Sequence, residues 1–332
     1  MLKKVSCFIL LIFLFILTSC NNAGFLTSVT NIRLYDGDIK AAEKEIYEFL
    51  DNFEKKISEK ISSSEISKIN KAKKDTAVTV SNETIELLNI ARDVYNKTDG
   101  AFNPCIYPVL KLYDFNKKTI PNDNKIDALL PYTDFNDLTI TANTVIKKYD
   151  EIKIDLGGIA KGYAADKCVE IAKKHNVTSG IIDIGRNIYI LGEKKDTNTS
   201  KNSLFTIGIT NPRNDGDLYF AKIDLSEISA VTSGDYERYF IKDGVRYCHI
   251  LDGLTGRKPD SNLISVSVFG TNSTLCDGYS TALFVMGMNK AIEFVKNNNL
   301  SVILIDESKN YYLSENLSIY NIDKDYKLYE AR

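Results

Sequence analysis

The chain has little glycine and proline, no excess of basic residues and no internal repeat of solenoid length. With 18 glycines and 6 prolines among 332 residues, collagen-like and Gly/Pro-rich repeat proteins are excluded, and an apolar content of 44% excludes intrinsic disorder. The 42 lysines and arginines are outnumbered by 44 aspartates and glutamates, which gives a formal charge of −2. Because no basic surplus exists to neutralise phosphates over a large surface, we do not expect the protein to bind nucleic acid.

Cysteine is present, but not in the spacing of a metal or redox centre. None of the six cysteines lies in a C-x-x-C pair, which argues against a zinc ribbon or a thioredoxin-like site. Four of them are widely spaced in the body of the chain, namely Cys105, Cys168, Cys248 and Cys276. The sequence leaves open whether they form two disulfides or stay as buried free thiols.

The N-terminus has the pattern of a bacterial export signal. Two lysines precede an apolar run over residues 7–17, which is too short to span a membrane comfortably. The ending Leu-Thr-Ser-Cys resembles a lipobox, so we predict a lipoprotein signal peptide over residues 1–19 and a lipidated Cys20 with a spacer over residues 20–25. Acyl chains (palmitate) on Cys20 would anchor the protein at the extracytoplasmic face of a bacterial membrane. The alternative is an ordinary signal peptide that is cleaved elsewhere.

The rest of the chain mixes helical and strand periodicities irregularly. Apolar residues at helical spacing predict a helix over residues 38–58 that is capped by Asp38. Further helices are predicted from Ser81 or Asn82 to just before Thr98, from the glycine pair at 157–158 to about His175, and over residues 274–287 and 290–296. Strands are predicted at 29–35, 138–141, 144–147, 180–184, 188–191, 205–210, 219–223, 263–269 and 302–305, with a loop or insertion at 116–127. This irregular order favours an α+β fold over a doubly wound sheet.

The segment from Asp155 to Asp166, Asp-Leu-Gly-Gly-Ile-Ala-Lys-Gly-Tyr-Ala-Ala-Asp, is the first candidate site. Its adjacent glycines at a strand-to-helix junction let a ligand approach the backbone, and the helix N-terminus offers unpaired N–H groups to an anion. Lys161 adds a positive charge that suits phosphate. The glycine spacing matches neither a P-loop nor Gly-x-Gly-x-x-Gly, and a tight turn with a surface lysine is the alternative.

A carboxylate and a hydroxyl share one face of the predicted helix at 274–287. Asp277 and Thr281 are four residues apart, and such residues are neighbours on a helix surface. These two oxygens, a backbone carbonyl and waters suit Mg²⁺ beside a phosphate. The alternative is that Asp277 only caps an ordinary buried helix.

His249 is the third candidate. It is one of two histidines, and it lies next to the turn-rich stretch Asp252-Gly-Leu-Thr-Gly256, whereas His175 follows two surface-type lysines. A histidine at such a place can serve as a site residue, and a structural role is the alternative.

Together, these segments occur in a recognisable order. The segments are residues 64–70 (Ser-Glu-Ile-Ser-Lys-Ile-Asn), 98–104 (Thr-Asp-Gly-Ala-Phe-Asn-Pro), 155–166, 232–240 (Thr-Ser-Gly-Asp-Tyr-Glu-Arg-Tyr-Phe), 249–256 and 277–287. In sequence and order they closely resemble the ApbE family, the bacterial FAD:protein FMN transferases. The resemblance covers roughly residues 26–325. It implies a single α+β domain over those residues, with mixed sheets, flanking helices and a central FAD cleft.

The resemblance also implies which residues bind Mg²⁺ and FAD. The metal ligands would be Asp277, Thr281 and the backbone carbonyl of Gly158, with Ser280 a weaker candidate. Contacts to FAD, the substrate, would come from Leu26, Ala101, Phe102, Asn103, Asp155, Lys161, His249 and Leu251, while Thr232, Ser233 and Arg238 would line the same cleft.

The implied reaction is attack by a Thr or Ser hydroxyl of an exported acceptor protein on the FMN-side phosphorus of FAD, with AMP leaving. The acceptor would be a subunit of a redox pump or another extracytoplasmic flavoprotein. His249 and Asp277 are the candidate catalytic bases, and we favour His249 because a metal holds a bound carboxylate in its ionised form. The alternatives are a Mg²⁺-dependent FAD pyrophosphatase that gives FMN and AMP, and a non-catalytic FAD-binding lipoprotein.

Five positions depart from the family pattern. Asn103 stands where the family commonly has Asp, and Gly253 where it usually has Pro. Cys248 replaces a frequent Ser, Arg186 interrupts a frequent Gly-Gly-Asn/Asp, and Lys60 occupies the place of a Tyr near the adenine. None of these changes removes a proposed metal ligand.

Overall fold

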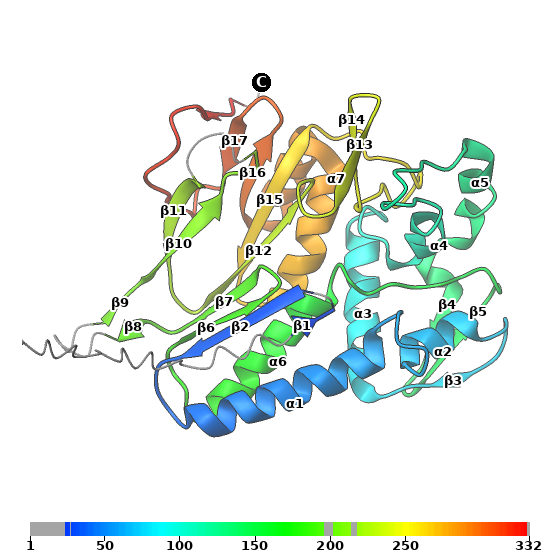
Figure 1. The fold of residues 1–332 in the computed structure, drawn as a ribbon, viewed down its shortest axis with the longest axis horizontal. Helices are drawn as coiled ribbons and strands as arrows, with labels where there is room; N and C mark the ends of the chain where they lie inside the picture. The colour runs from blue at the N-terminus through cyan, green and yellow to red at the C-terminus, as the bar shows by residue number, and fades with distance from the viewer. Residues whose placement is uncertain (1–23, 27, 196–201, 214–217, 331–332) are drawn as a thin grey trace, which may run out of the picture.

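A nine-stranded mixed sheet runs through the molecule (Figure 1). The structure is a computed structural model that describes residues 24–26, 28–195, 202–213 and 218–330, so the predicted signal peptide and Cys20 lie outside the described residues. Along the sheet the strands follow the order β1 (Gly24–Phe25), β2 (Ser28–Leu34), β6 (Gly180–Ile184), β7 (Asn187–Leu191), β12 (Ile228–Gly234), β15 (Leu263–Gly270), β16 (Ser301–Asp306), β17 (Asn310–Leu313) and β18 (Lys327–Leu328). Neighbouring strands are antiparallel except β17 and β18.

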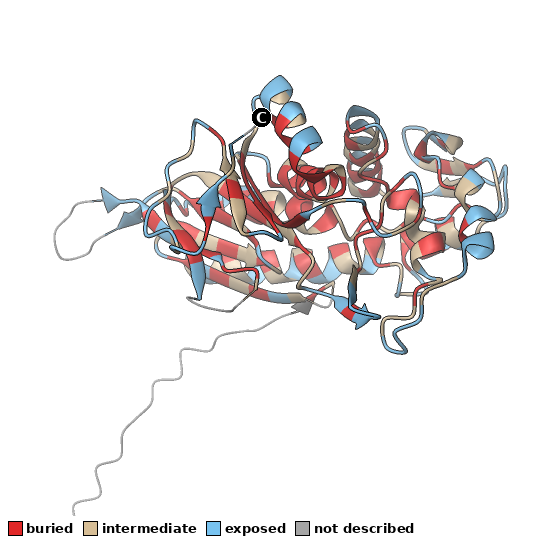
Figure 2. Cartoon of the chain, turned by 90° about the horizontal axis from the view of Figure 1, so that it is seen from above, coloured by how far each residue is buried: buried red, intermediate tan, exposed pale blue. Residues whose placement is uncertain are grey.

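Helices cover one face of this sheet. The long helix α7 (Ser273–Asn298) packs on β12 and β15, and α6 (Ala160–Lys174) packs on β6, β7 and α7. Helix α1 (Ile39–Ile57) lies against α6. Its N-cap is Asp38, whose Oδ1 accepts a hydrogen bond from the Ala41 amide at 3.1 Å, as the sequence predicts. Buried residues accordingly follow the sheet and the inward sides of the helices (Figure 2).

A β-hairpin covers the other face. Strands β10 (Phe205–Thr210) and β11 (Tyr219–Leu225) contribute Phe205 and Phe220 to a second core with Ile264 and Phe269 of β15. Strand β15 serves both cores because successive side chains of a strand point to opposite faces, so Val266 and Val268 face the helices while Phe269 faces the hairpin. Its register shifts between Leu263 and Ser265, as at a β-bulge.

A smaller part of the molecule packs beyond α7. It contains α2 (Glu65–Lys71), α3 (Asn82–Lys97), α4 (Tyr107–Leu110), α5 (Asp123–Asp127) and a three-stranded sheet of β3 (Val78–Thr79), β5 (Thr144–Lys147) and β4 (Leu138–Ile140). The remaining strands form two short antiparallel pairs, β8 (Lys194–Lys195) with β9 (Asn202–Ser203), and β13 (Tyr239–Lys242) with β14 (Val245–Cys248). Three short 3₁₀ helices complete the described elements, at Pro104–Ile106, Leu130–Tyr132 and Phe135–Asp137.

One predicted boundary is wrong. The stretch 116–127, predicted as a loop or insertion, ends in the short helix α5, which Asn122 caps by accepting a hydrogen bond from the Lys125 amide at 3.1 Å. The two helices predicted at 274–287 and 290–296 are confirmed, since both lie within α7 and a kink at Gly287 separates them. Gly287 has a φ of 74° and a ψ of 167°, which are not helical angles and which glycine permits.

Cys105, Cys168, Cys248 and Cys276 are free and buried. Of the two alternatives that the sequence left open, two disulfides or free thiols, the structure therefore shows free thiols. Burial raises the pKa of Cys248 to about 11. These thiols therefore act as small core residues.

Within the described residues, no helix combines the length and apolar character needed to cross a membrane.

Candidate active site

The site is built on the loop that leads into α6. The carboxylate of Asp155 accepts a hydrogen bond from the Gly157 amide at 2.9 Å and tightens the turn before the helix. Helix α6 begins at Ala160, and no side chain caps its first position. Its N-terminal amides therefore face the site with the positive end of the helix dipole.

Gly162 brings α6 and α7 into close contact. A Cβ atom at this position would overlap the backbone oxygen of Ser273 and lie 2.8 Å from Cβ of Asp277. Because the helices approach so closely, the Gly162 amide donates to Oδ2 of Asp277 at 2.9 Å. Asp277 is 3% exposed, and Nζ of Lys161 lies 3.8 Å from its Oδ1. The buried carboxylate is thus held in one orientation by groups of α6.

The three predicted metal ligands lie together. A Cβ atom built on Gly158 would lie 3.6 Å from Oγ1 of Thr281 and 3.3 Å from the Phe102 ring, so the glycine lets the backbone approach this hydroxyl. Oγ of Ser233 lies 3.4 Å from the same Thr281 hydroxyl. The structure therefore brings segments from β12, the 155–159 loop and α7 to one place.

The donors at this place fit a hard cation. Within the described residues, no cluster of three His, Cys, Asp or Glu side chains could hold a metal. A site with one carboxylate, one hydroxyl and one backbone carbonyl, completed by substrate oxygens and waters, is instead suited to Mg²⁺. Ser280, the weaker candidate, is fully buried, and its hydroxyl bonds Ser233 Oγ and the Asp277 carbonyl at 2.8 Å each. These bonds tie it to Ser233 and to the backbone at Asp277, and its role as a weaker metal ligand stays a prediction.

His249 directly follows β14 and is partly buried. Its amide donates to the Arg238 carbonyl at 3.0 Å, and its Nδ1 lies 3.4 Å from the same oxygen. Burial lowers the pKa of His249 to about 4, and the positive charges of Lys161 and Arg238 add to this effect. The imidazole is therefore neutral at physiological pH, which a proton acceptor requires.

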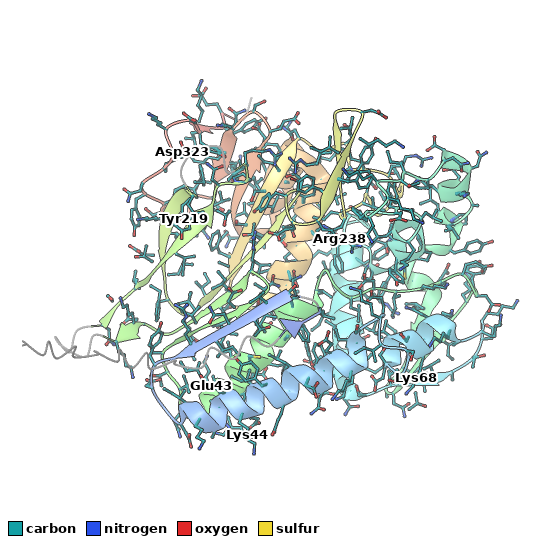
Figure 3. All side chains as sticks on the ribbon, in the orientation of Figure 1. Glu43, Lys44, Lys68, Tyr219, Arg238 and Asp323 are labelled. Atoms are coloured by element: carbon teal, nitrogen blue, oxygen red, sulfur yellow. The ribbon has the colours of Figure 1, made fainter. Side chains whose placement is uncertain are left out.

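Asp155 belongs to the same electrostatic group. Burial raises the pKa of its carboxyl, while the charges of Lys60, Lys161 and Arg238 act in the opposite direction. Arg238 leads into β13 (labelled in Figure 3) and lies over the Phe115 ring at 4.8 Å. Two predicted site residues, Asp155 and His249, are thus both influenced by the same two cations, Lys161 and Arg238.

Other predicted contact residues mainly hold the structure together. The side-chain amide of Asn103 donates to the carbonyls of Thr133 and Gly253 at 3.1 and 2.9 Å, and its Oδ1 accepts from the Cys105 amide at 2.9 Å.

Leu251 is buried with Val109 in a separate small core. The amide of Leu26 donates to Glu54 Oε1 at 3.1 Å, and the residue has a positive φ of 48°. Phe102 is 3% exposed beside Gly158, and Ala101 is partly buried. Their contacts to FAD stay predictions.

Sequence reasoning missed two features around the site. Glu59, just after α1, has a pKa that is raised by burial and by the charge of Asp155. It lines a cavity of about 630 Å³ with Tyr107 and Lys111. Asp235 forms a two-pronged ion pair with Arg213 at 2.7 and 2.9 Å. Neither residue stands out in the sequence, because its partners are distant along the chain.

Comparisons with known proteins agree with this architecture. The sequence model of the ApbE family matches residues 26–304. A Treponema pallidum protein named FAD:protein FMN transferase is 30% identical over 285 residues, covering 81% of this chain and 79% of its own. A Klebsiella pneumoniae protein of the same name is 29% identical over 317 residues, covering 93% of this chain and 96% of its own.

Solved structures show the same fold. The ApbE protein of Thermotoga maritima superimposes with a TM-score of 0.80 at 31% identity, covering 88% of this chain and 96% of its own. The flavin transferase ApbE of Vibrio cholerae gives a TM-score of 0.77 at 25% identity, covering 92% and 96%. The protein is a single-domain α+β protein of the flavin-transferase type, as predicted. It belongs to the ApbE family.

Proposed function

We propose that this protein is an FAD:protein FMN transferase that uses Mg²⁺ to move FMN from FAD to a Thr or Ser hydroxyl of an exported acceptor protein, and releases AMP. Membership of the ApbE family and the names of the relatives support the reaction class. The observation that carries the proposal is the arrangement of Asp277 and Thr281 beside Gly158 and the N-terminus of α6. A buried carboxylate, a hydroxyl and unpaired helix amides at one point suit a metal-bound diphosphate.

Asp277, Thr281 and the Gly158 carbonyl would hold the cation. When bound, Mg²⁺ neutralises charge on the diphosphate oxygens and favours departure of AMP. Lys161 and the first amides of α6 lie beside the same carboxylate and stabilise charge on these oxygens. These residues therefore fit a Mg²⁺ ion bound to a diphosphate, without further protein ligands from other parts of the chain.

The proton balance of the reaction requires a base. As the acceptor oxygen bonds to phosphorus, the phosphorus–oxygen bond to AMP breaks, and the hydroxyl proton leaves. His249 is neutral and free to take it, because its pKa lies near 4. Asp277 already accepts a hydrogen bond from Gly162 and lies near Lys161. We therefore assign the proton to His249.

Asp155, Lys161, Phe102 and His249 would bind the dinucleotide, while Asn103, through its three backbone partners, would hold the 101–104 loop in place. Leu26, Ala101 and Leu251 would contribute apolar or backbone contacts. Export and lipid anchoring at Cys20 are part of the same proposal, because they would put the enzyme and its acceptor in one compartment.

Incubation with FAD and Mg²⁺ tests the function. Covalent flavin fluorescence on a denatured acceptor is the expected result. Free AMP and FMN formed without acceptor would instead define a pyrophosphatase, and intact FAD would define a binding protein. Omission of Mg²⁺ with a chelator should stop the transfer, and transfer that continues would contradict the metal requirement.

A further inference from the structure

The hairpin of β13 and β14 projects from the molecule beside the candidate active site (Figure 1). It turns at Asp243 and Gly244, whose φ angles of 51° and 77° are those of the tight two-residue turn that Asp-Gly favours. At its other end, the His249 amide donates to the Arg238 carbonyl at 3.0 Å. The base of the hairpin is therefore part of the site, while its tip extends away from it.

The pairing in this hairpin leaves one set of backbone groups facing outward. The tight turn and the Arg238–His249 bond fix which pairs are hydrogen-bonded, namely Arg238–His249, Phe240–Tyr247 and Lys242–Val245. The N–H and C=O groups of Tyr239 and Ile241 therefore point away from β14. In the part of the chain that the structure describes, no backbone or side-chain group bonds them from outside the hairpin.

The side chains of the same strand are apolar and exposed. Tyr239 is 42% exposed and Ile241 is 51% exposed, and Val245 on β14 is 41% exposed. Phe240 between them is buried and packs on the rings of Tyr247 and Phe115 at 5.3 and 5.5 Å, so the hairpin is held firmly on its inner side. An apolar strand with open backbone groups is the kind of edge that proteins normally cover.

The hairpin is also locally basic in a chain that is acidic overall. Residues 238–249 carry Arg238, Lys242 and Arg246 against Asp243 alone, whereas the whole chain has a formal charge of −2. Arg246 lies over the Tyr239 ring at 3.8 Å and 3.6 Å from Asp235, which is already paired with Arg213. The outer edge of β13 therefore combines open backbone groups, apolar side chains and positive charge.

We propose that an extended, negatively charged segment of the acceptor protein adds to the outer edge of β13 as a further strand. Backbone hydrogen bonds to Tyr239 and Ile241 would hold the segment, and the apolar side chains would fix its register. Its inner end would reach Arg238 and His249, where the accepting hydroxyl is needed. The inference rests on the proposed function, since it names the surface by which that function selects its partner.

Ile241→Pro tests the proposal, because proline removes the outward N–H and no bond within the hairpin. The acceptor is taken from membranes of a strain that lacks this gene. It is the protein in those membranes that the wild-type enzyme labels with covalent flavin, and it is purified for the kinetic measurements. Ile241→Ala, which keeps the N–H, and Leu328→Pro, an exposed position on the other edge strand β18, are the controls. FAD affinity is measured for each variant by flavin fluorescence.

We expect Ile241→Pro to raise KM for the acceptor by about tenfold, with kcat and FAD affinity unchanged, as for the loss of one or two hydrogen bonds. Ile241→Ala should have a smaller effect and Leu328→Pro none. An unchanged KM in Ile241→Pro would overturn the docking proposal but leave the function intact. Wild-type enzyme that labels no protein would overturn the proposed function, and the docking with it.

A second variant covers the case in which proline disturbs the hairpin and lowers FAD affinity as well. Ile241→Asp keeps the outward backbone N–H, but its negative charge repels an anionic segment. It should raise KM for the acceptor, and high salt should reduce the difference from wild type. The same KM as wild type at low salt would overturn the proposal.

Discussion

At the scale of single residues, the site depends on groups with distinct tasks. Asp277 is buried and held in one orientation by Gly162, while Thr281 and Gly158 complete the oxygen donors. His249 stays neutral because burial and two nearby cations oppose its protonation. Because the environments of these residues differ, we expect a different effect from substitution of each one.

Asp277→Asn should lower the Mg²⁺-dependent turnover of FAD by about 100-fold or more, because a neutral amide no longer neutralises the cation. The measurement is the initial rate of AMP release against Mg²⁺ concentration. Asp166→Asn is the matched control, since the Asp166 carboxylate accepts hydrogen bonds from the Ser273 and Thr274 amides at 2.8 Å and from the Thr274 hydroxyl at 2.6 Å, all at the start of α7. This control should lower stability but keep the Mg²⁺ response. Equal Mg²⁺ responses in both variants would contradict the assignment.

His249→Ala should abolish transfer to the acceptor and leave FAD bound. The loss of the proton acceptor stops the chemical step, while Asp155, Lys161 and Phe102 would still bind the dinucleotide. Transfer rates and flavin fluorescence measured on the same sample separate the two effects. Retained transfer would remove His249 as the base.

The protonation of His249 should also be visible in the stability of the FAD-free protein. Its folded pKa of about 4 lies below the ordinary histidine value of 6.5 that holds in the unfolded chain, so the unfolded state takes up the proton first. The stability contribution is complete above about pH 6.5 and is lost as the pH falls through 4. Urea unfolding of the wild type and of His249→Ala over this range should diverge as the pH falls, with the wild type losing more. Parallel curves would contradict the lowered pKa.

At the scale of elements, the contact between α6 and α7 positions the site. Periodicity predicts both helices, because their apolar residues recur at helical spacing. It does not predict their separation, which is set by the missing side chain of Gly162. The β13–β14 hairpin is missed for another reason: its Asp-Gly turn is present in the sequence, but its strands are short and charged.

Gly162 and Gly158 should differ in how much stability the protein loses when each is changed to alanine. Gly162→Ala should destabilise the fold by about 2 kcal/mol or more, because the new methyl overlaps the Ser273 backbone. Gly158→Ala meets only the Phe102 ring and the Thr281 hydroxyl at ordinary or slightly short distances, so stability should change by less than about 1 kcal/mol. The Mg²⁺ requirement should rise in Gly158→Ala. Urea unfolding and Mg²⁺ titration together test the pair, and equal stability losses would contradict the geometry.

At the scale of the whole molecule, ordered motifs predict the family and the fold class. Four of these segments, from distant parts of the chain, meet at one place in the structure. They do not predict contacts between the motifs. Asn103 and Gly253, both departures from the family pattern, lie against each other: the Asn103 amide bonds the Gly253 carbonyl at 2.9 Å, and a Cβ on Gly253 would lie 2.7 Å from Asn103 Cβ. A separation of 150 residues hides this contact from any local pattern. It is a property of the folded chain only.

The most direct test is a crystal structure of the protein grown with FAD and Mn²⁺ as an anomalous substitute for Mg²⁺. The account predicts one anomalous peak within about 2.3 Å of Asp277, Thr281 and the Gly158 carbonyl, in contact with the diphosphate of FAD. A metal bound elsewhere, or a dinucleotide bound while these three oxygens have no metal, would contradict it.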